Sequence, residues 1–392
     1  MSKKPIKLLM VAGEASGDLH GGNLAKALKS LIPDVEMEGT GGNSMREAGV
    51  SILYDINKMG AVGIVELVGS LFHHFKIYRK LSSSIAQQKY DAAILVNYPG
   101  LNLRLAERCK AAGCPVFFYI SPQVWVWDRG RVKSISKTAT KMYVILPFEE
   151  KIYKDAGVDV EYHGHPFVDI PLPEESREEF LLGLGLNPDK KTIGILPGSR
   201  MNEIGTLLKD MLDAANIIKR KIPDCQFVLP VADTIDPNHI NETLGENPLD
   251  VKVVTKKTYN VMATSDFLIV ASGSATLEAG ILACPMVIIY QVHPLTLKIF
   301  SAFGSLEHFG LVNILADERV VPELLNQHAS PEKIAEEALR VLEDPEYNTI
   351  VKEKLIAMRK TLGENGVTER IANSIVIKLK QIEHTADEKI SI

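Results

Sequence analysis

The first half of the chain alternates short apolar runs with longer segments that mix apolar and polar residues. Apolar runs of strand length stand at residues 6–11, 92–96, 116–120 and 142–146, and a helical pattern covers about residues 22–31. A buried strand reads as an apolar run, whereas an amphipathic helix repeats its apolar positions with a helical period. The alternation predicts right-handed β-α-β units and a parallel sheet, whose ligand site lies at the carboxyl ends of the strands.

An acidic, proline-containing stretch, residues 166–188, interrupts this alternation, which then restarts. The second half predicts strands at 192–196, 226–230, 251–254, 267–270 and 286–290, with a long helix at 203–220. From Pro331 onward the pattern is helical, and the last helix, 368–382, is long enough to return to the first domain. We therefore predict an α/β protein with one Rossmann-like domain over residues 1–170, a second over 171–365, and a C-terminal segment over 366–392 that crosses back.

Small polar residues follow two of the apolar runs in the second half. After residues 267–270 come Ser272, Gly273, Ser274, Ala275 and Thr276, with Glu278 one turn further on. After residues 192–196 come Gly198, Ser199 and Arg200. Small residues let a ligand approach the backbone, N–H groups at a helix start attract anions, and arginine offers planar donors for phosphate. The two turns predict a nucleoside-diphosphate site, with Glu278 accepting hydrogen bonds from a ribose.

The first loop, residues 13–18, carries the carboxylates Glu14 and Asp18 just ahead of His20. Its glycines alone would indicate only a tight strand-to-helix turn, with Asp18 near the helix N-terminus. Holding these polar groups together at the end of a buried strand is costly without a polar ligand. We therefore predict a functional role for this loop.

The charge balance narrows the classes of partner. The 392 residues include 44 Lys and Arg and 49 Asp and Glu, which gives a formal net charge of −5. A dedicated nucleic-acid-binding domain is usually strongly basic, so we expect no nucleic acid. Lys3, Lys4 and Lys7 precede an apolar stretch that Glu14 and Asp18 interrupt, which argues against a secretory signal. No apolar run is long enough to span a bilayer, and we expect a cytoplasmic protein that can still lie on a membrane surface.

The potential metal ligands do not form a metal pattern. The pair His163 and His165 has no carboxylates at ligand spacing, so we expect no metal and assign His165 to a cleft or hinge. The cysteines are too far apart for a zinc site and lie mostly in apolar contexts, which predicts free thiols in a reducing compartment. These cysteines are Cys109, Cys114, Cys225 and Cys284.

Two segments combine apolar and basic residues. In residues 59–81 a helical apolar stripe has a basic flank, which suits either an ordinary core-facing helix or a helix resting on anionic lipid. The stripe includes Leu67, Leu71, Phe72 and Phe75, and the flank includes Lys76, Arg79 and Lys80. Trp125 and Trp127 precede further basic residues. They suit a membrane interface, sugar stacking or an ordinary core position, and we group them with the membrane or acyl-chain contacts.

Seven segments, in order, resemble the lipid-A-disaccharide synthase family, which comprises inverting glycosyltransferases of the GT-B fold. They are VAGEASGDLHG, MGAVGIVELVG, YISPQVWVWDRGRVKSI, LPFEEKIYKDAGVDVEYHGHPFVD, ILPGSRMNEI, ASGSATLEAGILACPMVIIYQVHPLT and GLVNILADERVVPELL. They cover most of the chain to about residue 327. The resemblance implies two Rossmann-like domains that face each other across a cleft.

The resemblance also implies a reaction and a setting. The sugar of UDP-2,3-diacylglucosamine would be transferred to 2,3-diacylglucosamine 1-phosphate, forming a β-1′,6 bond and releasing UDP. The enzyme would be peripheral on the cytoplasmic face of the inner membrane of a Gram-negative bacterium. Some members of the family form a C-terminally exchanged dimer, so a homodimer through the C-terminal segment enters the prediction. No cofactor is expected.

The resemblance implies direct displacement at the anomeric carbon by the acceptor 6-hydroxyl, which needs a proton acceptor near that oxygen. The family usually carries Asp-x-Pro-Asp-Phe-Asn where this chain reads Asn97-Tyr98-Pro99-Gly100-Leu101-Asn102, so the family's acidic groups are absent. We predict Glu14 as the base because it directly follows the strand end, and Asp18 as the cap of the following helix. His20 and Asn102 complete the candidate catalytic group. Asn313 is predicted to support the nucleotide end.

Two other functions stay open. One is a different GT-B enzyme acting on UDP-N-acetylglucosamine, such as the muramyl-pentapeptide transferase or a UDP-sugar 2-epimerase. The other is a non-catalytic relative that binds a lipid or a UDP-sugar, which the loss of the family's acidic residues makes worth testing.

Overall fold

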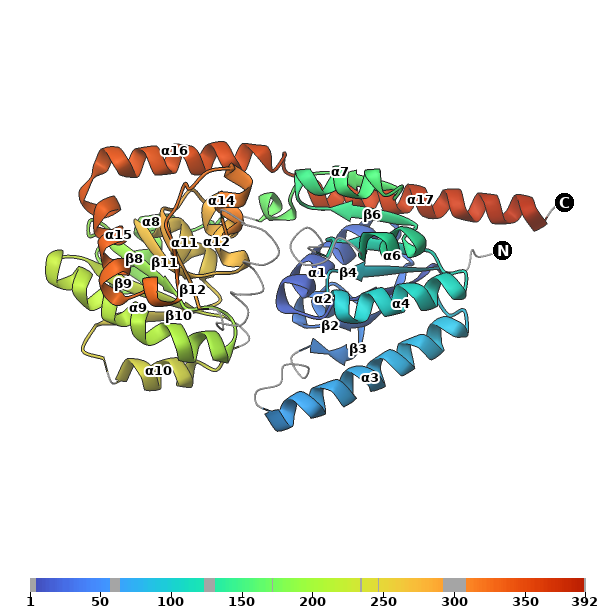
Figure 1. Ribbon diagram of the computed structural model, residues 1–392, viewed down its shortest axis with the longest axis horizontal. Helices are drawn as coiled ribbons and strands as arrows, with labels where there is room; N and C mark the ends of the chain where they lie inside the picture. The colour runs from blue at the N-terminus through green and yellow to red at the C-terminus, as the bar shows by residue number, and fades with distance from the viewer. Residues whose placement is uncertain are drawn as a thin grey trace. The chain divides into compact units, whose positions relative to one another are not determined.

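The computed structural model describes residues 5–56, 64–122, 131–170, 172–232, 235–245, 247–291 and 308–390, with side chains except at 64–74, 131, 327 and 386–390. These residues form two compact units. One unit comprises Met1–Asp169 and Leu362–Ile392, and the other comprises Ile170–Thr361 (Figure 1).

The first unit is built on a seven-stranded sheet in the order β3-β2-β1-β4-β5-β6-β7. All neighbouring strands are parallel. The strands are β1 Lys7–Val11, β2 Glu36–Gly41, β3 Ser51–Asp55, β4 Ala92–Val96, β5 Val116–Tyr119, β6 Lys141–Val144 and β7 Val160–Tyr162. The four apolar runs of the first half are β1, β4, β5 and β6, so the parallel sheet predicted from them is confirmed.

The sequence pattern misses β2, β3 and β7, whose unbroken apolar runs are at most three residues long. Strand β2 carries Glu36, Glu38 and two glycines. A Cβ at Gly39 would lie 1.8 Å from the carbonyl oxygen of Met10 on β1, so the strand can lie there only with glycine. The glycine that weakens the strand signal is therefore the residue that lets β2 pair with β1.

Helices flank this sheet. They are α1 Ala15–Leu31, α2 Asn43–Glu47, α3 Ile64–Ala86, α4 Pro99–Ala111, α6 Arg131–Thr138, α7 Pro147–Asp155, the short 3₁₀ helix η2 Pro166–Asp169, and α17 Val367–Ile390. Helix α1 begins at Ala15 rather than near residue 22. Gly22 lies inside it. A Cβ there would come 2.7 Å from the backbone of Ser44 on α2, so a glycine at this position lets α2 approach closely. Residues 15–18 of the predicted loop are thus helical, and Gly21 and Gly22 further along α1 let α2 pack closely.

The C-terminal helix α17 packs along α1 and so belongs to the first unit. The carboxylate of Asp169 accepts hydrogen bonds from the backbone N–H groups of Gly366 (2.7 Å) and Thr368 (2.8 Å). This carboxylate at the helix start satisfies N–H groups that have no partner within the helix. The hydroxyl of Tyr143 on β6 also donates to Ser374 Oγ, at 3.1 Å.

The second unit contains a six-stranded sheet in the order β10-β9-β8-β11-β12-β13, again with parallel neighbours. Its strands are β8 Thr192–Leu196, β9 Gln226–Val231, β10 Val251–Thr255, β11 Phe267–Ala271, β12 Met286–Tyr290 and β13 Glu323–Leu325. The predicted strands are all present, and the short edge strand β13 is additional. The helices are α8 Arg177–Gly183, α9 Met201–Lys221, α10 Pro237–Gly245, α11 Thr258–Thr264, α12 Ser274–Ile281, α14 Leu311–Ala316, η3 Asn326–His328, α15 Pro331–Glu343 and α16 Pro345–Thr361.

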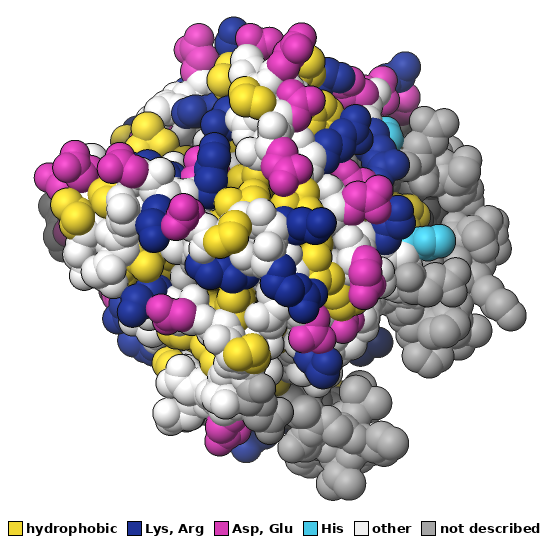
Figure 2. Space-filling model, turned by 90° about the vertical axis from the view of Figure 1, so that its left-hand side faces the viewer, with side chains coloured by type: hydrophobic (Ala, Val, Ile, Leu, Met, Phe, Trp, Pro, Cys, Tyr) yellow, Lys and Arg dark blue, Asp and Glu magenta, His cyan; other side chains and the backbone are white. Residues whose placement is uncertain are grey.

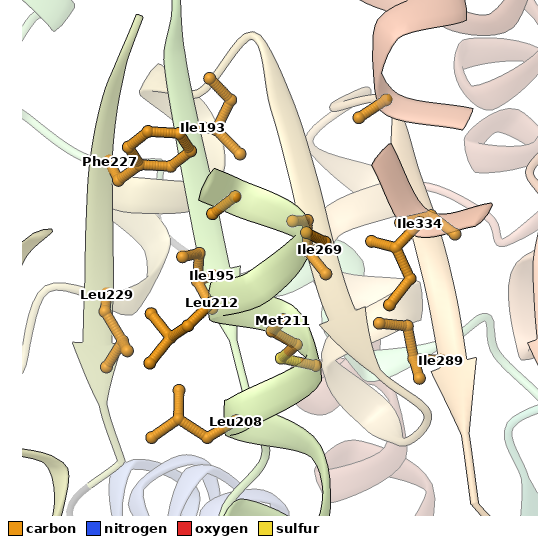
Figure 3. Packing of buried hydrophobic residues seen from close by; sticks show 14 of the residues in the cluster. Ile193, Ile195, Leu208, Met211, Leu212, Phe227, Leu229, Ile269, Ile289 and Ile334 are labelled. Atoms are coloured by element: carbon orange, nitrogen blue, oxygen red, sulfur yellow. The ribbon is translucent and has the colours of Figure 1, made fainter. Parts of the chain in front are cut away.

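The core of the second unit shows why these elements form. Alternate residues of β8, such as Ile193 and Ile195, point to one face of the sheet, where Leu208 and Leu212 of α9 pack against them (Figure 3). Residues four apart lie on one side of a helix, and residues two apart lie on one side of a strand. The apolar residues two apart on β8 therefore face the apolar residues four apart on α9, and the strand and helix patterns of the sequence predict the same buried layer.

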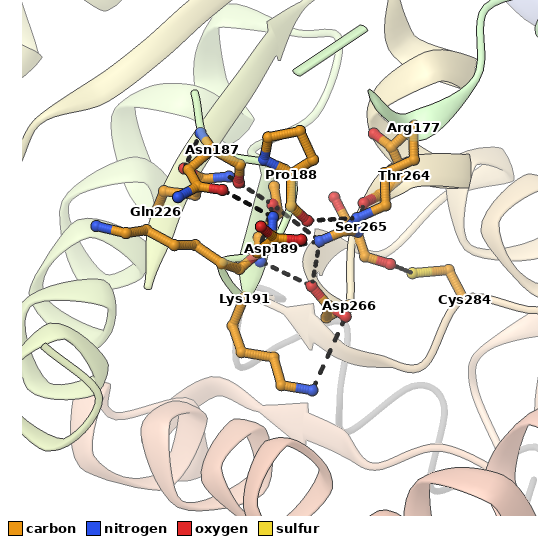
Figure 4. A network of polar contacts seen from close by, with 12 residues as sticks. Arg177, Asn187, Pro188, Asp189, Lys191, Gln226, Thr264, Ser265, Asp266 and Cys284 are labelled. Atoms are coloured by element: carbon orange, nitrogen blue, oxygen red, sulfur yellow. Dashed lines mark hydrogen bonds and ion pairs between the residues drawn. The ribbon is translucent and has the colours of Figure 1, made fainter. Parts of the chain in front are cut away.

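The amino ends of β8 and β11 are fastened by side chains. Arg177 at the start of α8 donates to the carbonyl oxygen of Thr264 and to Asp266 Oδ2 (2.9 Å), which also accepts the N–H of Thr192 at 2.8 Å (Figure 4). The acidic stretch before β8 is therefore not only a linker. Its residues begin α8, where the Ser176 Oγ accepts the N–H of Glu179.

The surface shown in Figure 2 carries basic and acidic side chains intermixed, as the nearly equal numbers of the two in the sequence lead one to expect. On the face of the second unit presented in Figure 2, Lys and Arg side chains alternate with acidic and apolar ones. None of the helices in the described residues combines the length and the apolar character that crossing a bilayer requires.

Candidate functional site

The two predicted turns of the second unit lie next to each other. Strands β8 and β11 are parallel neighbours, and the turns at 197–200 and 272–274 follow their carboxyl ends. From this pair the sheet continues outward in opposite directions, to β9 on one side and to β12 on the other. In open α/β sheets, ligands bind at such a switch point, outside the carboxyl ends of the strands.

The turn after β8 is held by Glu203 of α9. Gly198 has φ +109°, a conformation that favours glycine, and the N–H of Ser199 donates to Glu203 Oε2 at 3.1 Å. Arg200 is the N-cap residue of α9, and its Nη1 donates to Glu203 Oε1 at 2.7 Å. The side chain of Arg200 is 69% exposed. The turn thus brings the backbone N–H of Ser199 and the guanidinium of Arg200 to one carboxylate.

The turn after β11 is made of small residues. Gly273 is the N-cap residue of α12, and a Cβ there would meet no described atom within 4 Å. Gly273 and Ser274 are exposed, and Ser272 and Ala275 are half-buried. Thr276 is buried, and its hydroxyl donates to the carbonyl oxygen of Gly273 at 2.8 Å. Thr276 therefore closes the turn, while the residues before it form the accessible helix start.

Glu278 lies further along α12 and has a partner that the sequence did not reveal. The hydroxyl of Tyr259 on α11 donates to Glu278 Oε1 at 2.7 Å. Burial raises the pKa of Glu278, and the hydrogen bond from Tyr259 partly offsets that rise. The carboxylate is a hydrogen-bond acceptor held in a fixed orientation close to the turn after β11.

Asn313 is fully buried and contacts backbone. Its Nδ2 donates to the carbonyl oxygen of Val321 at 2.8 Å, and its Oδ1 accepts the N–H groups of Val320 and Val321. A further bond from Nδ2 reaches Glu323 Oε1 at 2.7 Å. Because the amide is used in this way, Asn313 fixes the segment 320–323 to α14.

The switch point of the first sheet lies between β1 and β4, and the structure brings two polar residues together there. Glu14 follows β1 as the half-buried N-cap residue of α1, and Asn97 follows β4. The Nδ2 of Asn97 donates to Glu14 Oε1 at 2.6 Å. Asn97 and Tyr98 both have positive φ, 44° and 52°, and a Cβ at Gly13 would lie 2.2 Å from the Tyr98 ring. Left-handed backbone at two successive non-glycine residues is uncommon and concentrates at functional sites.

Asn102 and Asp18 lie deeper and make structural contacts. Asn102 is fully buried, and its Nδ2 donates to the carbonyl oxygens of Val11, Val96 and Asn97 at 3.3, 3.2 and 2.6 Å. It therefore ties the ends of β1 and β4 together.

The prediction that Asp18 caps the helix following its own loop is wrong. Asp18 lies inside α1, and its carboxylate accepts the N–H groups of Gly42 (2.6 Å), Ser44 (2.9 Å) and Met45 (3.1 Å) at the start of α2. The reason is that α1 begins earlier than predicted, which turns Asp18 toward a different helix.

His20 is 3% exposed and packs among aromatic rings. Its ring centroid lies 4.9 Å from that of Phe167 and 6.4 Å from that of His165. Burial lowers the pKa of His20 to about 4, and burial together with His20 lowers the pKa of His165 to about 3. Both rings are therefore neutral near pH 7. His165, predicted for a cleft or hinge, is 2% exposed inside the first unit.

Helix α3 shows both an exposed and a buried side. Phe75 is 55% exposed, with the guanidinium carbon of Arg79 6.0 Å from its ring centroid, whereas Ile77 and Leu81 are buried. The helix thus contributes to the core and also presents an apolar and basic side. Outside the described side chains lie the remaining predicted membrane or acyl contacts, Leu67, Leu71, Phe72, Trp125 and Trp127.

Glu203, Tyr259 and Tyr290 were not predicted. Tyr290 ends β12, and burial raises the pKa of its hydroxyl, with smaller opposing effects from the charges of Arg200 and Glu203. Only Glu203 had a signal in the sequence. It stands three residues after Arg200, where a glutamate often caps the start of a helix. Among the described residues no group of three or more His, Cys, Asp or Glu is arranged to hold a metal ion.

Known structures share this fold at low sequence identity. A Staphylococcus aureus MnaA–UDP co-structure superposes with a TM-score of 0.65 at 13% identity, covering 96% of this chain and 97% of that one. The Neisseria meningitidis UDP-GlcNAc 2-epimerase bound to UDP-GlcNAc gives 0.62 at 15%, covering 95% and 100%. Acinetobacter baumannii MurG gives 0.56 at 12%, covering 95% and 99%. The predicted fold of two Rossmann-like domains is confirmed.

Sequence relatives agree on one family. The family model described as lipid-A-disaccharide synthetase matches residues 8–375. The lipid-A-disaccharide synthase of Syntrophus aciditrophicus is 41% identical over 375 residues, covering 95% of this chain and 98% of the relative. That of Geobacter metallireducens is 40% identical over 370 residues, covering 94% and 96%. The chain therefore belongs to the lipid-A-disaccharide synthetase family.

Proposed function

We propose that this glycosyltransferase condenses UDP-2,3-diacylglucosamine with 2,3-diacylglucosamine 1-phosphate to give the β-1′,6-linked disaccharide 1-phosphate and UDP. The observation that carries the proposal is the pair of turns at the switch point of the second sheet, in a chain of this family. Backbone N–H groups and Arg200 converge there beside small residues, which suits the diphosphate of a UDP-sugar. The second domain would bind the UDP-sugar, and the first domain would bind the acceptor.

The leaving group gains negative charge as the glycosidic bond to UDP breaks. We assign its stabilisation to Arg200, to the N–H groups after Gly198, and to the helix start at Gly273 and Ser274. These donors are fixed before the reaction, so they cost little reorganisation. Glu278 would accept hydrogen bonds from the ribose. Asn313 would act indirectly, by holding the segment at the end of α14.

The acceptor hydroxyl must lose a proton as it attacks. Glu14 fits the role of base because its carboxylate lies at the end of β1, half-buried, and is oriented by Asn97. His20 is enclosed by aromatic rings, and the carboxylate of Asp18 is occupied by three backbone N–H groups. We therefore assign Asp18, His20 and Asn102 to positioning the loop, and proton removal to Glu14.

The acyl chains require contact with a membrane. We assign this contact to the first domain through α3, whose exposed side carries Phe75 with Lys76, Arg79 and Lys80, on the cytoplasmic face of the inner membrane. Binding to anionic vesicles should weaken with salt. Changing Leu71 and Phe72 to Ser should release the protein while its thermal midpoint barely moves. A large fall in midpoint would instead place these residues in the core.

A homodimer through the C-terminal segment is also part of the proposal. Ile377 on α17 is 58% exposed, an apolar side chain on the surface of the segment concerned. Sedimentation of the wild type and of Ile377→Lys would test it. A single monomeric species for the wild type at micromolar concentration would exclude the dimer.

The test of the function is a product assay. Purified protein is incubated with both acylated substrates, and UDP release and disaccharide are followed by mass spectrometry. Disaccharide formation supports the proposal. Activity on unacylated UDP-N-acetylglucosamine alone would favour a different GT-B enzyme, and UDP-sugar binding without turnover would favour a non-catalytic relative. Activity should persist in excess chelator, and its loss with recovery on adding magnesium would contradict the assigned leaving-group chemistry.

A further inference from the structure

The turn that we assign to the diphosphate contains a carboxylate. Glu203 Oε2 accepts the N–H of Ser199 at 3.1 Å, and Glu203 Oε1 accepts Arg200 Nη1 at 2.7 Å. A backbone N–H and a guanidinium are the donors that a phosphate group would use in the same turn. One acidic side chain therefore bonds to donors of both kinds.

The packing of this carboxylate is close. A Cβ at Gly198 would lie 2.3 Å from Glu203 Oε2 and 3.0 Å from the Cβ of Glu203, so the carboxylate rests against the glycine backbone. The side chain of Glu203 is 26% exposed, whereas that of Arg200 is 69% exposed. The carboxylate thus lies deeper than the guanidinium, on the backbone surface that an incoming diphosphate would approach.

We infer that Glu203 is a positioning residue that competes with UDP. Its carboxylate holds the turn and Arg200 in place when the site is empty, and the diphosphate replaces it on those donors when UDP binds. The displaced carboxylate stays beside the bound diphosphate and repels it. The consequence for the reaction is that Glu203 weakens the binding of UDP as product and speeds its release. This inference rests on the proposed function.

The ordinary role of such a residue is to cap a helix. Glu203 is the third residue of α9, and a glutamate there often reaches back to a backbone N–H ahead of the helix. Glu179 has that arrangement in the same domain. It is the third residue of α8, and its Oε2 accepts the N–H of Ser176 at 2.8 Å. Glu179 lies outside the two turns and provides a matched control for charge removal at a capping glutamate.

The test compares Glu203→Gln and Glu179→Gln with the wild type by calorimetric titration of UDP and of uridine. Glutamine keeps an oxygen that can accept the Ser199 N–H, but it carries no charge. Glu203→Gln should bind UDP about fivefold more tightly, the effect of removing one like charge about 4 Å away in largely aqueous surroundings. Uridine has no diphosphate, and its affinity should not change. Glu179→Gln should match the wild type for both ligands.

The rate of UDP dissociation provides a second readout, because a cap that only stabilises the helix does not change it. Stopped-flow displacement should show slower release of UDP from Glu203→Gln than from the wild type or Glu179→Gln. If Glu203→Gln does not fold, Glu203→Met keeps the side-chain volume without charge, and its ratio of UDP to uridine affinity should rise above that of the wild type.

The outcomes separate this inference from the proposed function. UDP affinity that is equal or lower in Glu203→Gln, while Arg200→Met weakens UDP, overturns the competition and leaves Glu203 as a cap. If Arg200→Met binds UDP as the wild type does, the assignment of the turn to the diphosphate fails, and the proposed site fails with it.

Discussion

The two sheets place their candidate sites at the same topological position but build them from different groups. Between β8 and β11 the groups are backbone N–H donors, small residues and the exposed guanidinium of Arg200. Between β1 and β4 they are side chains bonded to one another or to the backbone, with Asn97 on Glu14 and Asn102 on three carbonyl oxygens. A site for an anion can be made largely from a local turn, whereas a base must be oriented by a partner from elsewhere in the chain.

The largest effect is expected at Glu14. The variant Glu14→Gln keeps an oxygen that can accept the amide of Asn97, so the loop should retain its geometry. It cannot take the proton of the acceptor hydroxyl, and turnover should fall by roughly 10²–10⁴. The rate is measured with saturating acylated substrates, and UDP affinity, which we assign to the other sheet, should stay within twofold or so. Normal turnover would show that Glu14 is not the base. The first sheet would then have no assigned catalytic group to compare with the donors of the second sheet.

Arg200 tests the other half of the comparison. Arg200→Met keeps much of the side-chain length without the charge, and UDP binding should lose roughly 1.5–3 kcal/mol, the usual cost of a hydrogen bond to a charged group. Because the side chain is 69% exposed and its ion pair with Glu203 lies at the surface, the thermal midpoint without UDP should hardly change. Calorimetry with UDP and a melting curve without it separate the two effects. A large fall in the midpoint with unchanged UDP affinity would make Arg200 a structural residue.

The same difference explains how far the sequence could predict the molecule. The strands with unbroken apolar runs and the helices around them were predictable because their patterns are local, as in β8, β11 and β12. The turn residues Gly198 and Gly273 were predictable for the same reason. The edge strands β7 and β13 have three residues each and leave too short a pattern to detect.

The pairs of side chains could not be predicted, because they join distant segments. Asn97 and Glu14 are 83 residues apart in the chain, and Tyr259 and Glu278 are 19 apart. Nothing in either segment alone specifies the partner. The misplaced start of α1 shows the same limit, because Gly21 and Gly22 inside it are explained by the packing of α2.

The variant Asp18→Asn tests whether Asp18, in the segment after β1, has a structural role rather than a catalytic one. In Asp18→Asn one oxygen can still accept N–H groups, but the amide nitrogen would face the N–H of Ser44 or its neighbours, and two donors would meet. Leaving a buried donor unpaired costs roughly 1–3 kcal/mol of stability. Urea unfolding should show this loss, while turnover below the unfolding transition should remain near that of the wild type. A reduced rate with unchanged stability would instead place Asp18 in the catalytic group beside Glu14.

The smallest effect is expected at Glu278, and it depends on pH. Burial raises the pKa of this carboxyl, so the folded protein holds its proton at pH values where the unfolded chain has lost it. The stability that this difference provides is fully present below the unfolded pKa, and it is lost as pH rises through the folded pKa. Glu278→Gln removes the titrating carboxyl group. The urea midpoint of the variant should therefore rise relative to that of the wild type as pH rises through this window. Tyr259→Phe should move the window to higher pH, because the hydrogen bond from Tyr259 lowers the pKa of Glu278. A difference between variant and wild type that stays constant with pH would show that burial does not disfavour the ionised carboxylate, and Glu278 would then resemble the exposed groups of its own turn.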